Sequence, residues 1–432
     1  MGIAAANRPA TTTVACSTMS LTADRELDIV LVGATGFVGR LTAQHLALHS
    51  PPTTRIGLAA RSSERLTRMQ ADLPDRARQW PLITLDVTDS AATTVLAGRT
   101  RVVVSTVGPY LRYGLPLVQA CATAGTDYAD LTGETLFARR AIDACHDVAR
   151  ATGARIVPAC GFDSVPSDLG VGLTAAVAAA DGHSQLADTV LHVRAIRGGI
   201  SGGTIDSLRH QILHAGTDRA LRAVARDPMA LAGGSDPAAE PRTRRPRRRL
   251  IERDPRTGGY QTRFVMGGFN RQIVLRSNEI AGRPYGPQFH YREVVDTGTG
   301  PAGAAKAAVI AAGSTAVMAG MMVPPTRWLL DAVLPSPGAG PSVRTRRRGR
   351  FLLEVEAATP GGPRYRTRIA ADQDPGYAAT AVMLAQSAFA LANDEDLPDR
   401  AGVLTPMTAL GENLAARLRA QDFRIETRVV RD

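Results

Sequence analysis

The stretch LDIVLVGATGFVGRLTAQHL, residues 27–46, decides the fold of this chain. It begins with the apolar run 29–32, which is typical of a strand buried on both faces. Three glycines follow at a spacing of three: Gly33, Gly36 and Gly39. A helical pattern then extends from Gly36 to His49. Such glycines allow a tight turn, a close approach of backbone to phosphate, and packing of a helix on a strand. Because the N-terminus of that helix offers free N–H groups to a phosphate, the stretch predicts a dinucleotide-binding loop.

The alternation of strand and helix continues from this loop to about Val165. Short apolar runs alternate with longer amphipathic stretches, a rhythm that is typical of βαβ units. We therefore expect an α/β fold with a Rossmann-type parallel sheet. The expected strands after the first are 56–61, 80–89, 101–108 and 126–134, and the expected helices are 63–73, 116–124 and 136–151.

The rhythm changes after Asp168, and the pattern there favours a second, α+β domain. Its expected elements are strands 188–196, 263–269 and 289–297, a helix at about 204–225, and a hairpin of 351–359 with 365–372. Two last helices begin where proline follows a capping residue, at Asp374 and Thr405. The expected organisation is a disordered extension over 1–24, a nucleotide-binding domain over 25–168, the α+β domain over 169–372 and C-terminal helices over 373–432.

Composition excludes several classes of function. The net charge is +11, and part of it lies in two arginine blocks, RTRRPRRR at 242–249 and RTRRRGR at 344–350. These blocks are either solvated loops or docking sites for an acidic partner. Aromatic residues make up only 4% of the chain and no nucleic-acid-binding motif accompanies the arginines, so we expect no nucleic acid as partner.

Cysteine usage and the apolar segments bear on the cellular compartment. The four cysteines form no CxxC pair, so we expect no metal site, no disulfide and a reducing cytosol. The first twenty residues lack the pattern of a signal peptide. The run AAVIAAGSTAVMAGMMV at 307–323 carries no charge but is short for a membrane span, so a buried helix or a surface-seeking segment is expected.

The second expected strand indicates which dinucleotide binds. NAD-specific loops place an acid there for the ribose 2′-hydroxyl. This strand ends instead at Arg61, followed by Ser62, and a guanidinium suits a 2′-phosphate. We therefore expect NADPH, although a plain surface arginine is the alternative for Arg61. The remaining expected cofactor contacts are Gly33, Thr35, Gly36, Phe37, Val38 and Gly39 in the loop, and Asp86, Gly108 and Pro109 at the ends of the next strands.

Long strings of the chain resemble one family. GATGFVGR, AARS, VVVSTVGPYLRYGLPLVQACATAGTDYADLTGE, ARIVPACGFDSVPSDLG and SGGTIDSL resemble the saccharopine dehydrogenase-like oxidoreductases. The similarity is closer still to the mycobacterial trans-acting enoyl reductases of phthiocerol and phenolphthiocerol lipid synthesis. The resemblance implies an NADPH-dependent reductase of a C=C bond in a carrier-bound polyketide or lipid intermediate. It also implies a mixed sheet in the second domain, with the C-terminal helices packed on the Rossmann domain.

Enoyl reduction needs a donor for the thioester oxygen and a proton for the α-carbon. Tyr110 and Tyr113 follow the fourth strand, and Ser164 lies in ACGFDSVPSD, so these three are the candidate catalytic residues. Packing is the alternative role for Tyr110. Asp163, in the same segment as Ser164, is a further candidate donor, but helix capping is the role that its position favours. Lys306 is the only lysine, so the chain lacks a lysine acid in these motifs.

The expected partners are the acyl carrier domain of a modular polyketide synthase and a long-chain acyl substrate. The arginine blocks would dock the acidic carrier, and 307–323 would touch the acyl chain or a membrane surface. The expected location is the cytoplasm, with peripheral contact at the inner face of the membrane. Two alternatives stay open: a saccharopine-type C–N oxidoreductase and a non-catalytic NADP(H)-sensing protein.

Overall fold

The computed structural model describes residues 25–198, 207, 209–211, 213, 216, 218–233, 249–287, 289–322, 326, 340 and 342–430. The expected N-terminal extension over 1–24 lies outside the described residues. So do 242–248 of the first arginine block and, in the helix expected at 204–225, residues 204–206, 208, 212, 214, 215 and 217.

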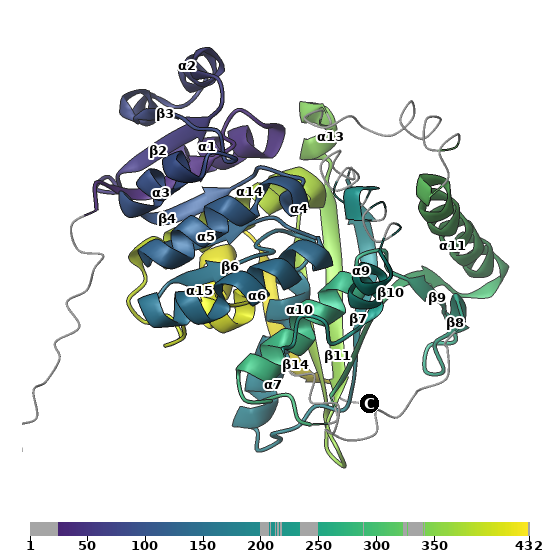
Figure 1. Ribbon diagram of the computed structural model, residues 1–432. Helices are drawn as coiled ribbons and strands as arrows, with labels where there is room; N and C mark the ends of the chain where they lie inside the picture. The colour runs from purple at the N-terminus through teal and green to yellow at the C-terminus, as the bar shows by residue number, and fades with distance from the viewer. Residues whose placement is uncertain are drawn as a thin grey trace, which may run out of the picture.

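Sheet A contains seven parallel strands and forms one half of the molecule (Figure 1). Its central strands are apolar and buried on both faces, as the sequence predicts. The Rossmann-type sheet is thereby confirmed. In spatial order the strands are β13 (Gly402–Val403), β6 (Arg155–Val157), β5 (Asp127–Asp130), β4 (Thr100–Ser105), β1 (Leu27–Val32), β2 (Ile56–Ala60) and β3 (Leu82–Thr84).

Helices cover both faces of sheet A. One layer packs together through Leu96, Val118 and Phe137, and it consists of α3 (Ser90–Gly98), α5 (Leu115–Ala124) and α6 (Thr135–Thr152). The opposite layer consists of α1 (Phe37–His49), α14 (Thr380–Asn393) and α15 (Pro406–Arg419). Shorter helices at the edges are α2 (Ser63–Ala71), α4 (Tyr110–Tyr113) and the 3-10 turn η1 (Asp75–Gln79).

Sheet B also has seven strands, but it is mixed. One face packs against α7 (Val165–Ala180) and α10 (Gly267–Ile280), which lie between the two sheets. Its other face carries ion pairs: Glu356 contacts Arg194, Arg256, Arg364 and Arg366. In spatial order the strands are β14 (Arg424–Val430), β12 (Arg364–Ala371), β11 (Arg350–Ala358), β7 (Asp188–Arg197), β10 (His290–Gly298), β9 (Tyr260–Arg263) and β8 (Ile251–Arg253).

The strand expected at 263–269 is wrong. β9 ends at Arg263, and α10 begins at Gly267, so the segment contains a strand end, a turn and a helix start. The apolar residues Val265 and Phe269 lie on opposite sides of that boundary. The remaining short helices of the described second half are α9 (Arg219–Arg226) and α13 (Val343–Arg347).

The two C-terminal helices begin as expected. The Asp374 side chain accepts from the N–H of Tyr377 at the π-helical turn η2 (Pro375–Ala379), which leads into α14. The Thr405 side chain accepts from the N–H of Thr408 at the start of α15. α14 packs on α1 and on β4 and β5, so the C-terminal helices return to the Rossmann sheet as expected.

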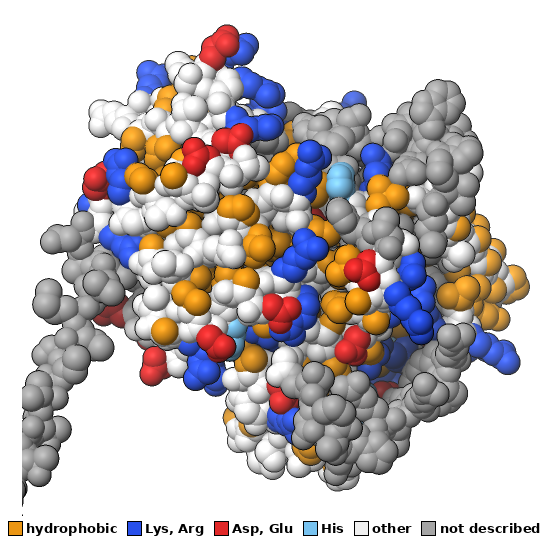
Figure 2. Space-filling model, viewed as in Figure 1, with side chains coloured by type: hydrophobic (Ala, Val, Ile, Leu, Met, Phe, Trp, Pro, Cys, Tyr) orange, Lys and Arg blue, Asp and Glu red, His pale blue; other side chains and the backbone are white. Residues whose placement is uncertain are grey.

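Helix α11 (Gly300–Met322) stands at the outer edge of sheet B beside β8 and β9. Among the described residues, it is the one helix that is long and apolar enough to cross a membrane, by length and composition alone; 17% of its apolar window is buried. Figure 2 shows hydrophobic side chains gathered over this helix.

Candidate functional site: a cavity at the edge of sheet A

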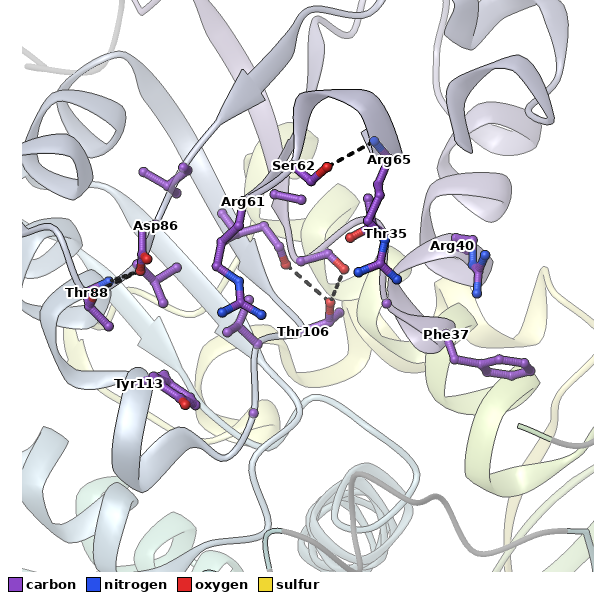
Figure 3. Close-up of a pocket in the computed structure, with 18 residues that line it drawn as sticks. Thr35, Phe37, Arg40, Arg61, Ser62, Arg65, Asp86, Thr88, Thr106 and Tyr113 are labelled. Atoms are coloured by element: carbon purple, nitrogen blue, oxygen red, sulfur yellow. Dashed lines mark hydrogen bonds between the residues drawn. The ribbon is translucent and has the colours of Figure 1, made fainter. Parts of the chain in front are cut away.

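A cavity of about 550 Å³ opens at the carboxyl ends of β1, β2 and β4 (Figure 3). Ligands of open α/β sheets bind at this edge, where the strand order reverses. β1 lies between β2 and β4, so the cavity is at that reversal. The lining residues are Val32, Gly33, Thr35, Gly36, Phe37, Arg40, Ala60, Arg61, Ser62, Arg65, Leu85, Asp86, Val87, Thr88, Thr106, Val107, Gly108 and Tyr113.

Two glycines are required by the shape of the loop after β1. Gly33 has φ +85°, a left-handed conformation that favours glycine. A Cβ on Gly39 would lie 2.2 Å from the Gly33 carbonyl oxygen, so only glycine lets α1 pack this closely on the loop. The loop is also held from β4, because the Thr106 hydroxyl donates to the Val32 and Gly33 carbonyls at 3.2 and 3.1 Å.

The N-terminus of α1 is open to an anion. Gly36 is its N-cap residue, no side chain caps it, and its first turn contains no acid. The first N–H groups of a helix have no partner within the helix and carry partial positive charge. This loop and helix start therefore fit the pyrophosphate of a dinucleotide.

Three arginines from two helices and a strand end line the next part of the cavity. Arg40 comes from α1, Arg61 follows β2 and Arg65 comes from α2. All three are exposed, and none forms an ion pair within the described part of the chain. Ser62 caps α2 by accepting from the Arg65 N–H at 3.2 Å. Unpaired guanidiniums beside a second helix start fit the 2′-phosphate of NADP.

Asp86 lies opposite Arg61 across the cavity (Figure 3). Its Oδ1 accepts from the N–H and hydroxyl of Thr88, at 2.9 and 2.7 Å. Those hydrogen bonds and the charge of Arg61 hold the pKa of Asp86 below its usual value. Asp86 is therefore an oriented acceptor, suited to an amino group such as that of adenine.

Most of the expected cofactor residues line the cavity, and three do not. Val38, Gly39 and Pro109 are outside the lining, because α1 turns Val38 away and Gly39 serves only helix packing. The expectation missed Arg40. Arg40 follows Gly36 by one helical turn, so its place on the same face of α1 was a usable signal. Thr106, at the end of the fourth expected strand, lines the cavity as well as bonding the β1 backbone.

The Tyr110 side chain does not line the cavity. Its ring is buried, and its hydroxyl donates to the Ser105 carbonyl at 3.0 Å and accepts from the Leu131 N–H at 3.2 Å. Burial raises the pKa of Tyr110, and the charge of Asp130 adds to the effect. This arrangement favours the packing alternative, and it corrects the expectation that Tyr110 faces the substrate.

The other two candidate catalytic residues also lie apart. Tyr113 lines the cavity on the side of Asp86 and Thr88 (Figure 3). Ser164 is fully buried, and its hydroxyl donates to Asn270 Oδ1 at 2.9 Å. No hydrogen bond joins Tyr113 or Ser164 to Tyr110 within the described residues. The structure thus does not assemble the three candidates into one group.

A buried polar cluster joins Ser164 to a carboxyl group on sheet B. Asn270 Nδ2 donates to Glu293 Oε2 at 3.0 Å, and Glu293 Oε1 accepts from the hydroxyls of Ser167 and Tyr291 at 2.6 and 2.7 Å. Burial raises the pKa of Glu293, and the charge of Asp163 raises it further. These groups hold the start of α7 against β10.

Asp163 differs from its neighbours because its side chain has no hydrogen-bond partner within the described residues. It is half-buried after β6, and Ser164, the N-cap residue of α7, makes no side-chain cap. Burial raises the pKa of the Asp163 carboxyl to about 6. The capping role expected as its alternative is therefore absent. The sequence signal was its place in ACGFDSVPSD, between a strand of sheet A and α7.

One arginine of the second block reaches the cofactor loop. Arg346 in α13 places its guanidinium carbon 5.4 Å from the Phe37 ring centroid. Phe37 also meets Tyr377 edge-on at 4.9 Å. Arg344, Arg348 and Arg350 are exposed. The block at 344–350 is therefore divided between the cavity rim and the solvent.

Known proteins resemble this chain over nearly its whole length. Residues 29–157 match the saccharopine dehydrogenase NADP binding domain family. A protein named trans-acting enoyl reductase from Mycobacterium tuberculosis (strain ATCC 25618 / H37Rv) is 45% identical over 413 residues, 92% of this chain and 96% of that protein. One of the same name from Mycobacterium leprae (strain TN) is 45% identical over 407 residues, 91% of this chain and 96% of that protein.

The fold has a solved counterpart. Apo saccharopine dehydrogenase (L-Glu forming) from Saccharomyces cerevisiae matches 94% of this chain and 100% of its own, with a TM-score of 0.52 and 13% identity. At that identity the likeness concerns the fold alone. The sequence relatives carry the assignment: the chain belongs to the trans-acting enoyl reductase family and is an NADP-dependent oxidoreductase.

Proposed function

We propose that this enzyme reduces a C=C bond in an acyl chain held as a thioester on a carrier domain of a modular polyketide synthase. The observation that carries the proposal is the cavity at the edge of sheet A, with its open helix start and three unpaired arginines. The family name of the relatives supports the reaction type. A phthiocerol-type lipid precursor is the substrate class we expect.

NADPH, when bound, supplies the hydride for this reduction. The first N–H groups of α1, which follow Gly36, would hold its pyrophosphate, and Arg61 and Arg65 its 2′-phosphate. Asp86 and Tyr113 would flank the adenine, which gives Tyr113 a binding role in place of the catalytic role first expected. By holding the cofactor at several points, these residues position it for transfer to the β-carbon.

The proton for the α-carbon needs a separate source. Gly108 ends the β4 side of the cavity, and β4, β5 and β6 are neighbours whose carboxyl ends share one edge. Asp163 lies six residues after β6, on the loop that leads from this edge into α7. A thioester laid along this edge would reach it. We therefore assign the proton to Asp163, whose carboxyl has no other partner in the described part of the chain.

The carrier domain would dock through the exposed arginines of the second block. Arg344, Arg348 and Arg350 lie on the same segment as Arg346, which contacts Phe37 at the cavity rim. A carrier bound there would lie near the cofactor, and rim charges of this kind steer the encounter with an acidic partner. Replacing the exposed three with Ser should raise KM for the carrier-bound substrate and leave KM for a small thioester unchanged.

We propose that the regions expected from the sequence have separate roles. We assign cofactor binding to 25–168, substrate and partner contact to 169–372, and closure of the Rossmann layer to the helices of 373–432. We place the enzyme in the cytoplasm, with peripheral contact at the inner membrane face.

The direct test is NADPH oxidation with purified enzyme and an α,β-unsaturated acyl chain on a carrier domain. We expect steady oxidation and a product two hydrogens heavier by mass spectrometry. A saturated acyl chain on the same carrier is the control. Binding of NADPH without turnover of any unsaturated thioester would contradict the proposal and leave a sensing role. Turnover of an imine would instead indicate a C–N oxidoreductase.

A further inference from the structure

Among the described residues, helix α11 packs on the rest of the protein along one stripe of its first half. Gly303, Ala307 and Ala311 are buried, and their spacing of four places them on one face. This face packs on β8, β9 and β10 at the end of sheet B. The first half of the helix is therefore held against the sheet, and within the described part of the chain most of the remaining helix surface is exposed.

The outward face of α11 is apolar. Lys306 is the only charged residue of the helix. Val309 on this face is 72% exposed; Ile310 and Met318, each seven residues after a packed residue, lie on the packed side of the helix and are each 39% exposed. A helix that faces water normally carries charged residues on its outer face. At about 1.5 Å per residue, the 23-residue helix presents this surface over roughly 34 Å.

The neighbouring β8–β9 hairpin extends the apolar surface. Leu250, just before β8, and Val265, two residues after β9, are each 54% exposed. With the three side chains of α11 they make five of the ten exposed large hydrophobic residues in the described chain. Such a concentration marks an interaction surface, because single exposed apolar side chains are normally scattered.

Cations border this surface. Lys306 lies near the start of α11, and Arg249 and Arg253 lie at the two ends of β8, all exposed. Figure 2 shows basic side chains on both sides of the hydrophobic group over α11. Exposed apolar side chains can enter the acyl-chain boundary of a bilayer, and cations beside them attract anionic headgroups, so this combination favours contact with an anionic bilayer.

We propose that α11 and the β8–β9 hairpin dock this enzyme on the surface of an anionic lipid bilayer, with α11 lying along the interface. Because its buried stripe stays packed on sheet B, the helix inserts one face and does not span. This proposal states which surface makes the membrane contact named under the proposed function. It rests on that proposed function only in taking the substrate to be a lipid precursor. Vesicle binding is measured without turnover, so the two proposals fail separately.

The experiment is flotation of the full chain with vesicles of phosphatidylcholine alone and of equal parts phosphatidylcholine and phosphatidylglycerol. We expect binding to the anionic vesicles, weakened by salt. The double variant Val309→Asp, Ile310→Asp should lower partitioning at least about tenfold. Lys306→Ser and Arg253→Ser should each lower it about fivefold.

The matched control is Val95→Asp, because Val95 is 60% exposed on α3, far along the chain from this surface. It should bind vesicles as the unchanged protein does. NADPH affinity, measured for every variant, reports that the Rossmann half is folded. Absence of binding to anionic vesicles would overturn the proposal. So would binding that the double variant leaves unchanged, or a dimer in light scattering that the double variant dissociates, since a second copy would then be the occupant.

Discussion

The two sheets have the same number of strands but use them in opposite ways. Sheet A is parallel and covered by helices on both faces, so it offers a ligand only the backbone and loops at its carboxyl edge. Sheet B is mixed, with one face on α7 and α10 and the other carrying paired charges. The difference teaches where function resides: at an edge in the first sheet, and on faces and flanking segments in the second.

The largest effect is expected from a substitution in the loop at the carboxyl edge of sheet A, which tests whether this edge binds the cofactor. Gly39→Val would push a side chain into the Gly33 carbonyl, 2.2 Å from the position of its Cβ. We expect NADPH binding to weaken more than about a hundredfold, because overpacking against backbone costs about 3 kcal/mol or more. Isothermal titration measures the dissociation constant.

The control is Gly98→Ala, where an added Cβ meets nothing within 4 Å. It should bind NADPH normally. Normal NADPH affinity in Gly39→Val would show that the loop is not the cofactor site.

The charged face of sheet B should respond through stability instead. Burial alone would raise the pKa of Glu356, but Arg256 and Arg366 hold it at about 2. A depressed folded-state pKa adds stability above the unfolded value, near 4.5, and that stability is lost as pH falls toward 2. Glu356→Gln should therefore cost about 3 kcal/mol of unfolding free energy at neutral pH, measured by urea denaturation.

The difference between Glu356→Gln and the unchanged protein should shrink as the pH falls from about 4.5 to 2. Glu26→Gln, which breaks an exposed pair with Arg99, is the control and should cost less than about 1 kcal/mol. NADPH affinity should not change in either variant. A loss of affinity in Glu356→Gln would mean that the two sheets are not separate in function.

Asp163 lies where the two regions meet, and its substitution sharpens the comparison. Asp163→Asn should lower kcat about a hundredfold and leave NADPH affinity unchanged, as expected for loss of a proton donor. With the Asp163 pKa raised to about 6, kcat should fall as pH rises above that value, and the Asn variant should lose this dependence. The charge of Asp163 raises the pKa of Glu293, so the pH dependence of kcat should also be measured in Glu293→Gln and compared with that of Asp163→Asn.

Asp143→Asn, at an exposed position on α6, is the control for Asp163. An unchanged kcat and pH profile in Asp163→Asn, together with normal enoyl reduction, would remove Asp163 from the mechanism but leave the proposed reaction intact.

The smallest of these effects concerns cofactor choice. Arg61→Asp should replace attraction of the 2′-phosphate by repulsion and shift the NADPH/NADH affinity ratio about thirtyfold toward NADH, or about 2 kcal/mol. The control is Arg68→Asp. Arg68 lies on α2, the helix that follows Arg61, and is paired with Glu64, so this variant should leave the ratio unchanged. An unaltered ratio in Arg61→Asp would assign the 2′-phosphate to Arg40 or Arg65.

Local pattern predicted sheet A better than sheet B. The central strands β1, β2 and β4 are continuous apolar runs that can be recognised from the sequence alone, whereas the two-residue strand β13 was not predicted. Helix α10 was missed because it buries polar residues, among them Asn270, Gln272 and Arg276, which hide its apolar period. Strand β14 was missed because its pairing with β12 joins segments distant in the chain.

The candidate site divides in the same way. Arg61 was predictable from its place at a strand end, and the loop glycines from their spacing. The orientation of Tyr110 was not, because the Ser105 carbonyl and the Leu131 N–H that hold its hydroxyl lie on β4 and after β5. Sequence proximity to Gly108 favoured Tyr110 as the donor, but three-dimensional hydrogen bonding turns it away.

The last strands of the described chain have a consequence for synthesis. β13 and β14 lie within 402–430, and each occupies an outer position, one in each sheet. On the ribosome, neither sheet can gain its seventh strand until that segment has emerged. Until then β6 and β12 carry open backbone edges, which invite pairing with other nascent chains. Correct folding of both halves therefore waits until residues 402–430 have been synthesised, and slow synthesis of this segment would favour aggregation.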